Sequence, residues 1–238
     1  MTERYQVIQG LLDLFNNPSY LEIGVNEGVT FHNVIASKKV AVDPHFLFKD
    51  FERDDASTYF EETSDRFFEF EAFSPERYDV VYLDGLHTLE QTLRDLLNAI
   101  GRINEYGIIV IDDVLPNSYR ASLKNLSEFE ALWAAADLKG DVSWMGDVYR
   151  LVFFIRAFMR GFSYATIKDN HGQLVLWRAQ RGAEESSDRL VEEIARLEYK
   201  DLLLSSHEYN FMDFTEIVRL LRARNRFVSS CPSRSASS

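Results

Sequence analysis

Short apolar runs alternate with amphipathic segments along most of the chain. Runs of aliphatic and aromatic residues that stop abruptly at a glycine or a carboxylate are typical of strands buried on both faces of a parallel sheet. The predicted strands span residues 20–24, 39–43, 58–63, 78–83, 107–111, 162–167 and 173–178.

Apolar residues at intervals of three and four predict helices between these strands. Thr88 and Gln91 have the spacing of a capping box at one helix start. The predicted helices span residues 5–15, 28–37, 89–100, 123–136, 147–159 and 184–197, with a last one around 214–221. The turn formers in 168–172 join the last two strands into a hairpin. The pattern predicts a Rossmann-like doubly wound α/β sheet, mostly parallel, with an antiparallel closing hairpin and C-terminal helices.

The length and composition of the chain indicate how it is divided into domains. A chain of 238 residues with 46% hydrophobic content suits one α/β domain with an elaboration. We expect one α/β domain with its N-terminal helix over 1–180, a helical elaboration over 181–227, and a disordered tail over 228–238 that is mostly Ser, Arg and Pro.

The net charge of the chain limits the classes of partner that the protein is expected to bind. The net charge of −12 argues against nucleic acid as the main partner, because phosphate neutralisation needs an excess of Lys and Arg. A small-molecule substrate fits better. Cys231 stands alone, residues 1–15 lack a signal-peptide core, and the longest apolar runs are too short to span a membrane. We therefore expect a cytoplasmic protein without a membrane partner.

Carboxylates follow two of the predicted buried strands. Asp84 comes directly after 78–83, and the pair Asp112 and Asp113 comes directly after 107–111. Ligands of open α/β sheets bind beyond the carboxyl ends of the strands, so these acids are well placed to hold a metal ion. Mg²⁺ suits such an all-oxygen site, although an Asp-Asp pair alone can also cap a helix or lie solvated in a loop.

A glycine turn follows the first strand. Three residues separate Gly24 from Gly28, a spacing that does not match the dinucleotide fingerprint. Asp43 lies nineteen residues after Gly24 at the end of the second strand, where a carboxylate can accept both hydroxyls of a ribose.

This combination resembles the class I S-adenosylmethionine-dependent methyltransferases over roughly residues 20 to 180. The resemblance implies that the turn from Gly24 to Gly28 passes the methionine and ribose portions of the cofactor and that Asp43 holds the ribose diol. It also implies that Glu22 lies under the amino-acid end, and that Ser64 and Asp65 lie near the adenine.

Within that superfamily, the segments 83–87 and 111–113 resemble the divalent-metal-dependent O-methyltransferases that act on sugar hydroxyls of macrolides and aminocoumarins. The resemblance implies Asp84, Asp112 and Asp113 as ligands of Mg²⁺ or another divalent cation. It is compatible with a homo-oligomer, and the oligomeric state stays open. His87, three residues past Asp84, is the nearest candidate for the base that takes the proton of the hydroxyl, with Asp84 as its catalytic partner; a structural role that orients Asp84 is the alternative.

The leading hypothesis is a Mg²⁺-dependent S-adenosylmethionine O-methyltransferase acting on a hydroxyl of a small molecule, such as a sugar moiety of a natural product. A metal-independent N- or O-methyltransferase and a non-catalytic Rossmann-like binding protein are the alternatives. A sugar-nucleotide transferase is disfavoured because its acid-x-acid spacing is absent at Asp112 and Asp113.

Overall fold

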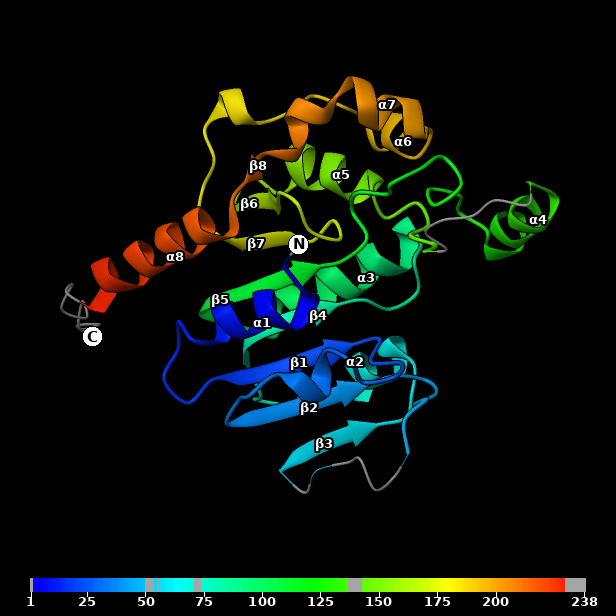
Figure 1. Cartoon of the computed structure of the whole chain (residues 1–238). Helices are drawn as coiled ribbons and strands as arrows, with labels where there is room; N and C mark the ends of the chain where they lie inside the picture. The colour runs from blue at the N-terminus through cyan, green and yellow to red at the C-terminus, as the bar shows by residue number, and fades with distance from the viewer. Residues whose placement is uncertain (1, 50–53, 55, 71–73, 137–142, 230–238) are drawn as a thin grey trace.

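One eight-stranded sheet organises the chain (Figure 1). The computed structural model describes residues 2–49, 54, 56–70, 74–136 and 143–229. The strands are β1 Ser19–Ile23, β2 Lys38–Val42, β3 Ser57–Phe60, β4 Tyr78–Leu83, β5 Ile103–Ile111, β6 Phe162–Ile167, β7 Leu174–Arg178 and β8 Phe211–Met212. Their spatial order is β3-β2-β1-β4-β5-β7-β6-β8.

The first five strands are parallel, and β7 pairs antiparallel with both β5 and β6. The order reverses between β1 and β4, which is the switch point where open α/β sheets bind their ligands. The predicted Rossmann-like sheet with an antiparallel closing hairpin is therefore confirmed. β8, which the sequence pattern missed, adds a short parallel edge strand beside β6.

Helices cover both faces of the sheet (Figure 1). The α-helices are α1 Arg4–Leu12, α2 Ser64–Phe70, α3 Leu89–Ile100, α4 Leu126–Ala136, α5 Arg150–Phe158, α6 Val191–Ile194, α7 Tyr199–Leu204 and α8 Phe214–Ser229. Apolar side chains of α2, α3, α5, α6 and α7 share one core with the sheet, and those of α1 and α8 share the core on the opposite face. No helix within the described ranges has both the length and the apolar character needed to cross a bilayer.

Strand and helix formation follows from simple patterns. Residues 108–111 of β5 are fully buried, which explains the unbroken apolar run, since a central parallel strand contacts helices on both faces. Thr88 is the N-cap of α3, with its hydroxyl accepting the Gln91 main-chain N–H at 3.4 Å, but the predicted capping box is incomplete because the Gln91 side chain donates to Ser64, Asp65 and Asp95 instead.

The helix predicted over 28–37 is wrong. That segment contains only a 3-10 turn over Phe31–Asn33. Asn26 and Gly28 both have positive φ, 50° and 74°, so the chain leaves β1 in a left-handed loop rather than in helical geometry.

The single helix predicted over 184–197 is also wrong. The segment divides into a 3-10 turn over Ala183–Glu185 and the one-turn helix α6, with non-helical residues 186–190 between them. Ser187 bonds the Arg189 main-chain N–H through its hydroxyl at 3.3 Å, a local contact that competes with the helix. Of the tail predicted over 228–238, residues 228 and 229 continue α8, and 230–238 lie outside the described residues.

Candidate functional site

The carboxyl ends of four parallel strands meet at one edge of the sheet. Ile23 pairs with both Val42 and Leu83, and Leu83 pairs in turn with Ile111. The ladder extends one residue further, because the main-chain N–H of Asp84 donates to Ile23 at 2.8 Å and that of Asp112 donates to Leu83 at 3.0 Å. The topology thus brings the residues after β1, β2, β4 and β5 side by side.

A cavity of about 440 Å³ opens at this edge. Its walls come from the residues that follow β1, β2, β3 and β4, and from the first turns of α2 and α3. The lining residues are Ile23, Gly24, Asn26, Val42, Asp43, Pro44, Thr63, Ser64, Asp65, Asp84, Gly85, Leu86, His87 and Gln91. Gly24, Asp43, Ser64, Asp65, Asp84 and His87, all predicted as site residues, therefore share one cavity.

Gly24 permits the tight packing beneath this cavity. Its φ is +86°, and a Cβ at this position would overlap the main-chain carbonyl oxygen of Asp84. Both the backbone conformation and the close approach of the β4 end exclude a side chain here. Gly28 also has a positive φ, but it packs against the His32 ring and lines neither this cavity nor its neighbour.

Asp43 is held rigidly at the end of β2. Its two carboxylate oxygens accept the main-chain N–H groups of Asn26 and His45, each at 2.8 Å. Only 8% of the residue is exposed, yet it lines the cavity. A carboxylate has about four acceptor positions, so Asp43 retains capacity to accept hydroxyl groups from a ligand.

Ser64 and Asp65 begin α2 and are tied to α3. The Gln91 side-chain amide donates to the Ser64 hydroxyl at 3.2 Å and to Asp65 at 3.1 Å, and Arg94 pairs with Asp65 at 2.6 Å. These contacts, the Gln91 hydrogen bond first, lower the pKa of Asp65. The wall of the cavity is therefore fixed by a polar bridge between two helices.

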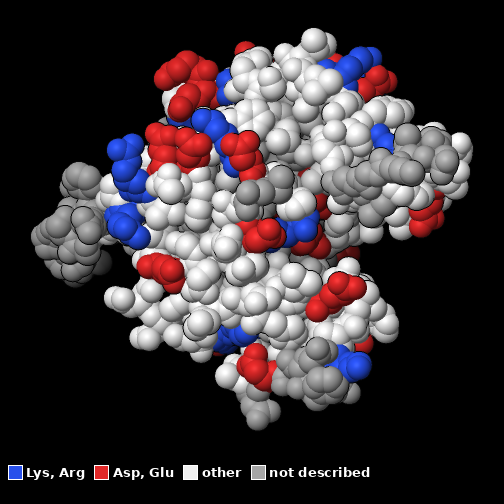
Figure 2. All heavy atoms as spheres, viewed as in Figure 1, with Lys and Arg blue, Asp and Glu red and all other residues white. Residues whose placement is uncertain are grey.

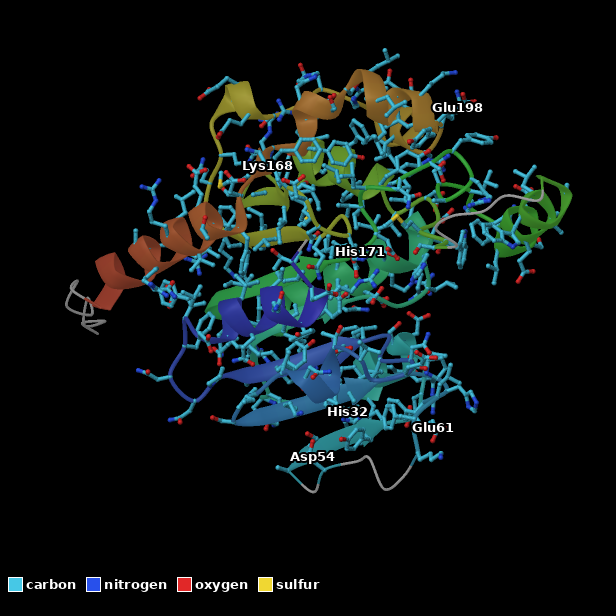
Figure 3. The ribbon with its side chains drawn as sticks, in the orientation of Figure 1. His32, Asp54, Glu61, Lys168, His171 and Glu198 are labelled. Atoms are coloured by element: carbon cyan, nitrogen blue, oxygen red, sulfur yellow. The ribbon has the colours of Figure 1, made fainter. Side chains whose placement is uncertain are left out.

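A second cavity of about 350 Å³ adjoins the first, and both are lined by Gly24, Asn26, Asp84 and His87. Apart from Gly24, Val25 and Val29, its walls are polar or charged. The remaining lining residues are Glu3, Arg4, Tyr5, Glu22, Asn26, Glu27, Thr30, Asp84, His87 and His171. His171, labelled in Figure 3, comes from the turn between β6 and β7.

Glu22 lies on β1 at the floor of the second cavity. It is 1% exposed and accepts the Tyr20 hydroxyl at 2.5 Å. Burial raises the pKa of Glu22 well above its usual range, and the hydrogen bond from Tyr20 opposes this only in part.

Three side chains converge beside the point where the two cavities meet, and two of them, Asp84 and His87, line both cavities. One ligand atom each of Asp84, His87 and Asp113 lies within 4.8 Å of the other two. The Nε2 atom of His87 is 3.1 Å from Asp113 Oδ2 and 3.6 Å from Asp84 Oδ1. The sequence predicted two of these three as metal ligands and the third as the base.

His87 is oriented by its other ring nitrogen. Nδ1 lies 2.7 Å from the main-chain carbonyl oxygen of Trp144, so Nδ1 carries a proton and Nε2 faces the carboxylates. Burial lowers the pKa of His87, but the charges of Asp113 and Asp84 outweigh burial and raise it to about 10. Gly146, with φ +61°, lets the 144–146 loop pack directly on the His87 main chain.

Asp113 is a strained and incompletely satisfied carboxylate. Its φ of +61° is unfavourable for a residue with a side chain, and 3% of it is exposed. Among the described residues, Oδ2 is buried and accepts no hydrogen bond, although His87 Nε2 lies 3.1 Å from it. Burial raises the pKa of Asp113 well above its usual range, while the His87 charge opposes the rise. A buried oxygen without a hydrogen bond, next to another carboxylate and an imidazole nitrogen, fits the donor set of a divalent cation.

Asp112 also lies at this edge, but both of its carboxylate oxygens already accept hydrogen bonds. Its Oδ2 accepts hydrogen bonds from Arg4 Nε and from the Tyr82 hydroxyl, and its Oδ1 accepts the Asp113 main-chain N–H at 2.9 Å. The structure thus places Asp112 beside the cluster of Asp84, His87 and Asp113, not within it.

Sequence reasoning missed the residues that support this cluster. Tyr82 could have been found, because the two-residue period of a strand puts it on the same face as Asp84, and its hydroxyl lies 3.1 Å from Asp84 Oδ2. Trp144 gave no local signal, because it lies 57 positions along the chain from His87. Arg4 gave no signal, since its contact with Asp112 spans 108 positions of the chain.

The fold and this ligand-binding edge define a Rossmann-like methyltransferase architecture. Residues 21–114 match the family model described as a methyltransferase domain, a span that runs from β1 to the acids after β5. This match supports the resemblance to the class I S-adenosylmethionine-dependent methyltransferases over residues 21–114.

Solved structures share this fold. An O-methyltransferase from Bacillus cereus in complex with SAH is 14% identical, with a TM-score of 0.53, over 75% of this chain and 83% of that one. Cofactor-bound Rv0187 from MTB is 13% identical, with a TM-score of 0.51, over 76% of this chain and 83% of that one. None of the curated proteins compared with the sequence matches it.

Proposed function

We propose that the protein transfers the methyl group of S-adenosylmethionine to a hydroxyl of a small molecule with the help of a divalent cation, Mg²⁺ by preference. The observation that carries this proposal is the convergence of Asp84, His87 and Asp113 at the junction of the two cavities. Carboxylate oxygens at such a point are the ligands that Mg²⁺ prefers.

The larger cavity suits the adenosine portion of the cofactor. Asp43 would accept the ribose hydroxyls at the end of β2, and the wall formed by Ser64 and Asp65 would face the adenine. Gly24 keeps the floor of the cavity free of a side chain. Glu22 would lie beneath the amino-acid end, in the second cavity.

The polar second cavity suits a hydroxylated acceptor. Its lining by Arg4, Glu27, Thr30 and His171 supplies both donors and acceptors of hydrogen bonds, as the recognition of a sugar requires. Figure 2 shows acidic and basic side chains interspersed on one face of the molecule, without a continuous basic strip on that face. A sugar moiety of a natural product is the acceptor that we propose.

Asp84 and Asp113 would hold the cation. When bound, the cofactor supplies an electrophilic methyl group and the cation lowers the pKa of the acceptor hydroxyl. The Nε2 atom of His87 faces this point, and a cation held by Asp84 and Asp113 would offset the two charges that raise the pKa of His87. We therefore assign the neutral imidazole the role of proton acceptor. Its Nδ1 keeps its proton and donates a hydrogen bond to the Trp144 carbonyl oxygen, which holds the ring in place while Asp113 stabilises the imidazolium.

One assay tests this proposal. Purified protein is incubated with methyl-labelled S-adenosylmethionine and a panel of sugar-bearing and catechol-type acceptors, with Mg²⁺ or with EDTA. Labelled product that forms with Mg²⁺ and disappears in EDTA is the expected result. Transfer that proceeds undiminished in EDTA would refute the cation requirement.

A metal-independent methyltransferase is the second candidate. The observation in its favour is the pairing of His87 Nε2 with Asp113 Oδ2 at 3.1 Å, since a His–Asp pair can deprotonate a hydroxyl or an amine unaided. Titration of Mg²⁺, Mn²⁺ and Ca²⁺ into the assay separates the two candidates, because only the first predicts saturation with the ion.

A further inference from the structure

We propose that Arg4 is a positioning residue that withholds Asp112 from the cation site and thereby limits how tightly the site binds a divalent ion. The inference rests on the proposed function, because it concerns the same cation. It gives a role to a residue of α1, a helix that lies outside the motifs at the strand ends.

The first step is the contact itself. Arg4 Nε donates to Asp112 Oδ2, and Arg4 Nη2 lies 3.7 Å from Asp113 Oδ1. The Asp112 side chain is fully buried and the Arg4 side chain is 34% exposed, lining the second cavity. The guanidinium therefore reaches from the cavity wall to the acids that follow β5.

The second step is the state of Asp112. Oδ2 accepts two hydrogen bonds, from Arg4 and Tyr82, and Oδ1 accepts the Asp113 main-chain N–H. Asp112 would need to lose its Arg4 contact before it could turn an oxygen toward Asp84 and Asp113.

The third step is the anchoring of Arg4. α1 begins at Arg4 and is fixed on the sheet by four fully buried side chains, Val7, Ile8, Leu11 and Leu12. Gln9 also accepts the Ile35 main-chain N–H at 2.7 Å. The guanidinium is thus delivered by a packed helix, and its contact with Asp112 is part of the fold.

Arg4 opposes cation binding in two ways. It keeps one carboxylate out of the ligand set, and its own positive charge lies close enough to repel a dication. Removal of Arg4 should free Asp112 as an additional ligand. Removal of a residue with a purely structural role would lower the affinity for the cation, whereas removal of Arg4 should raise it.

The test is Mn²⁺ binding to the full chain, measured by the electron paramagnetic resonance signal of the free ion. The variants are Arg4→Gln, Asp112→Asn and the double variant, with Arg219→Gln as the control. Arg219 is 80% exposed on α8, so its loss removes the same charge far from the cluster. Arg4→Met, which keeps the aliphatic stem, replaces Arg4→Gln if that variant does not fold.

We expect Arg4→Gln to bind Mn²⁺ at least about tenfold more tightly than the wild type. In the Asp112→Asn background the same change should gain less than about threefold, because the freed ligand is missing. Arg219→Gln should leave the affinity unchanged.

Two results would overturn the inference alone: wild-type binding of Mn²⁺ with no gain in Arg4→Gln, or an equal gain in both backgrounds. Failure of the wild type and of Arg4→Gln to bind Mn²⁺ would instead refute the cation proposal, and the inference with it.

Discussion

The imidazole of His87 is held by the main chain of Trp144. Nδ1 lies 2.7 Å from the Trp144 carbonyl oxygen, and the two rings lie 5.3 Å apart between centroids. This contact fixes both the tautomer and the direction of Nε2, which points at Asp84 and Asp113. A residue 57 positions along the chain thus orients the imidazole that we propose as the base.

His87→Gln should lower kcat by a hundredfold or more, because glutamine cannot accept the proton from the acceptor. Affinity for Mn²⁺ should change little if His87 is the base, and should fall clearly if it is a cation ligand. His45→Gln is the matched control, since the His45 side chain is 78% exposed. Unchanged turnover in His87→Gln would refute its catalytic role.

Gly24→Ala should destabilise the protein by about 2 kcal/mol or more and abolish cofactor binding. The added Cβ would overlap the Asp84 carbonyl oxygen, and alanine would be forced to adopt φ +86°. Urea unfolding and calorimetry with SAH measure the two effects. Gly161→Ala is the control, because no atom lies within 4 Å of its added Cβ, and it should change neither quantity. A stable Gly24→Ala variant that binds SAH would contradict the account.

Asp43→Asn should weaken SAH binding about tenfold or more, because the amide cannot accept hydrogen bonds from both ribose hydroxyls through two oxygens. Isothermal titration calorimetry gives the affinity. Asp54→Asn, an acid before β3 that lines neither cavity, should bind SAH as the wild type does. Equal affinities of the two variants for SAH would show that Asp43 does not bind the cofactor.

Asp95→Asn should stabilise the protein at neutral pH. Burial raises the pKa of Asp95 from 3.8 to about 6, so the folded state binds a proton more tightly than the unfolded state does. The wild type therefore loses stability as pH rises from about 4 to about 6, by about 3 kcal/mol, and the loss persists above pH 6. Asparagine carries no charge and avoids this loss.

Denaturant unfolding of wild type and Asp95→Asn at pH 4 and pH 7.5 checks this prediction. The two proteins should have nearly equal stability at pH 4 and differ at pH 7.5, with the variant more stable. A difference of the same size at both pH values would show that packing or hydrogen bonding, not ionisation, is responsible.

Much of the architecture was predictable because parallel strands carry a strong local signal. The buried runs that became β1, β2 and β4 each end at the larger cavity, and β5 ends next to β4 at the same edge of the sheet. Gly24 and Asp43 were singled out from their spacing, and both line this cavity, while their cofactor roles stay predictions.

The rest depended on contacts that no local pattern encodes. Arg4 meets Asp112 only after α1 packs on the sheet, and Trp144 meets His87 only after the following loop folds back. The segment 28–37 has helical spacing of apolar residues, but the left-handed conformation of Asn26 and Gly28 overrides it. The division of the catalytic domain from the elaboration at residue 180 stays a prediction.

The central claim is that a cofactor and a divalent cation meet at the junction of the two cavities. A crystal structure with SAH and Mn²⁺, with anomalous difference density collected for manganese, tests it most directly. The account predicts SAH beside Gly24 and Asp43 and a manganese peak bound by Asp84 and Asp113. A manganese peak elsewhere, or SAH outside the larger cavity, would contradict it.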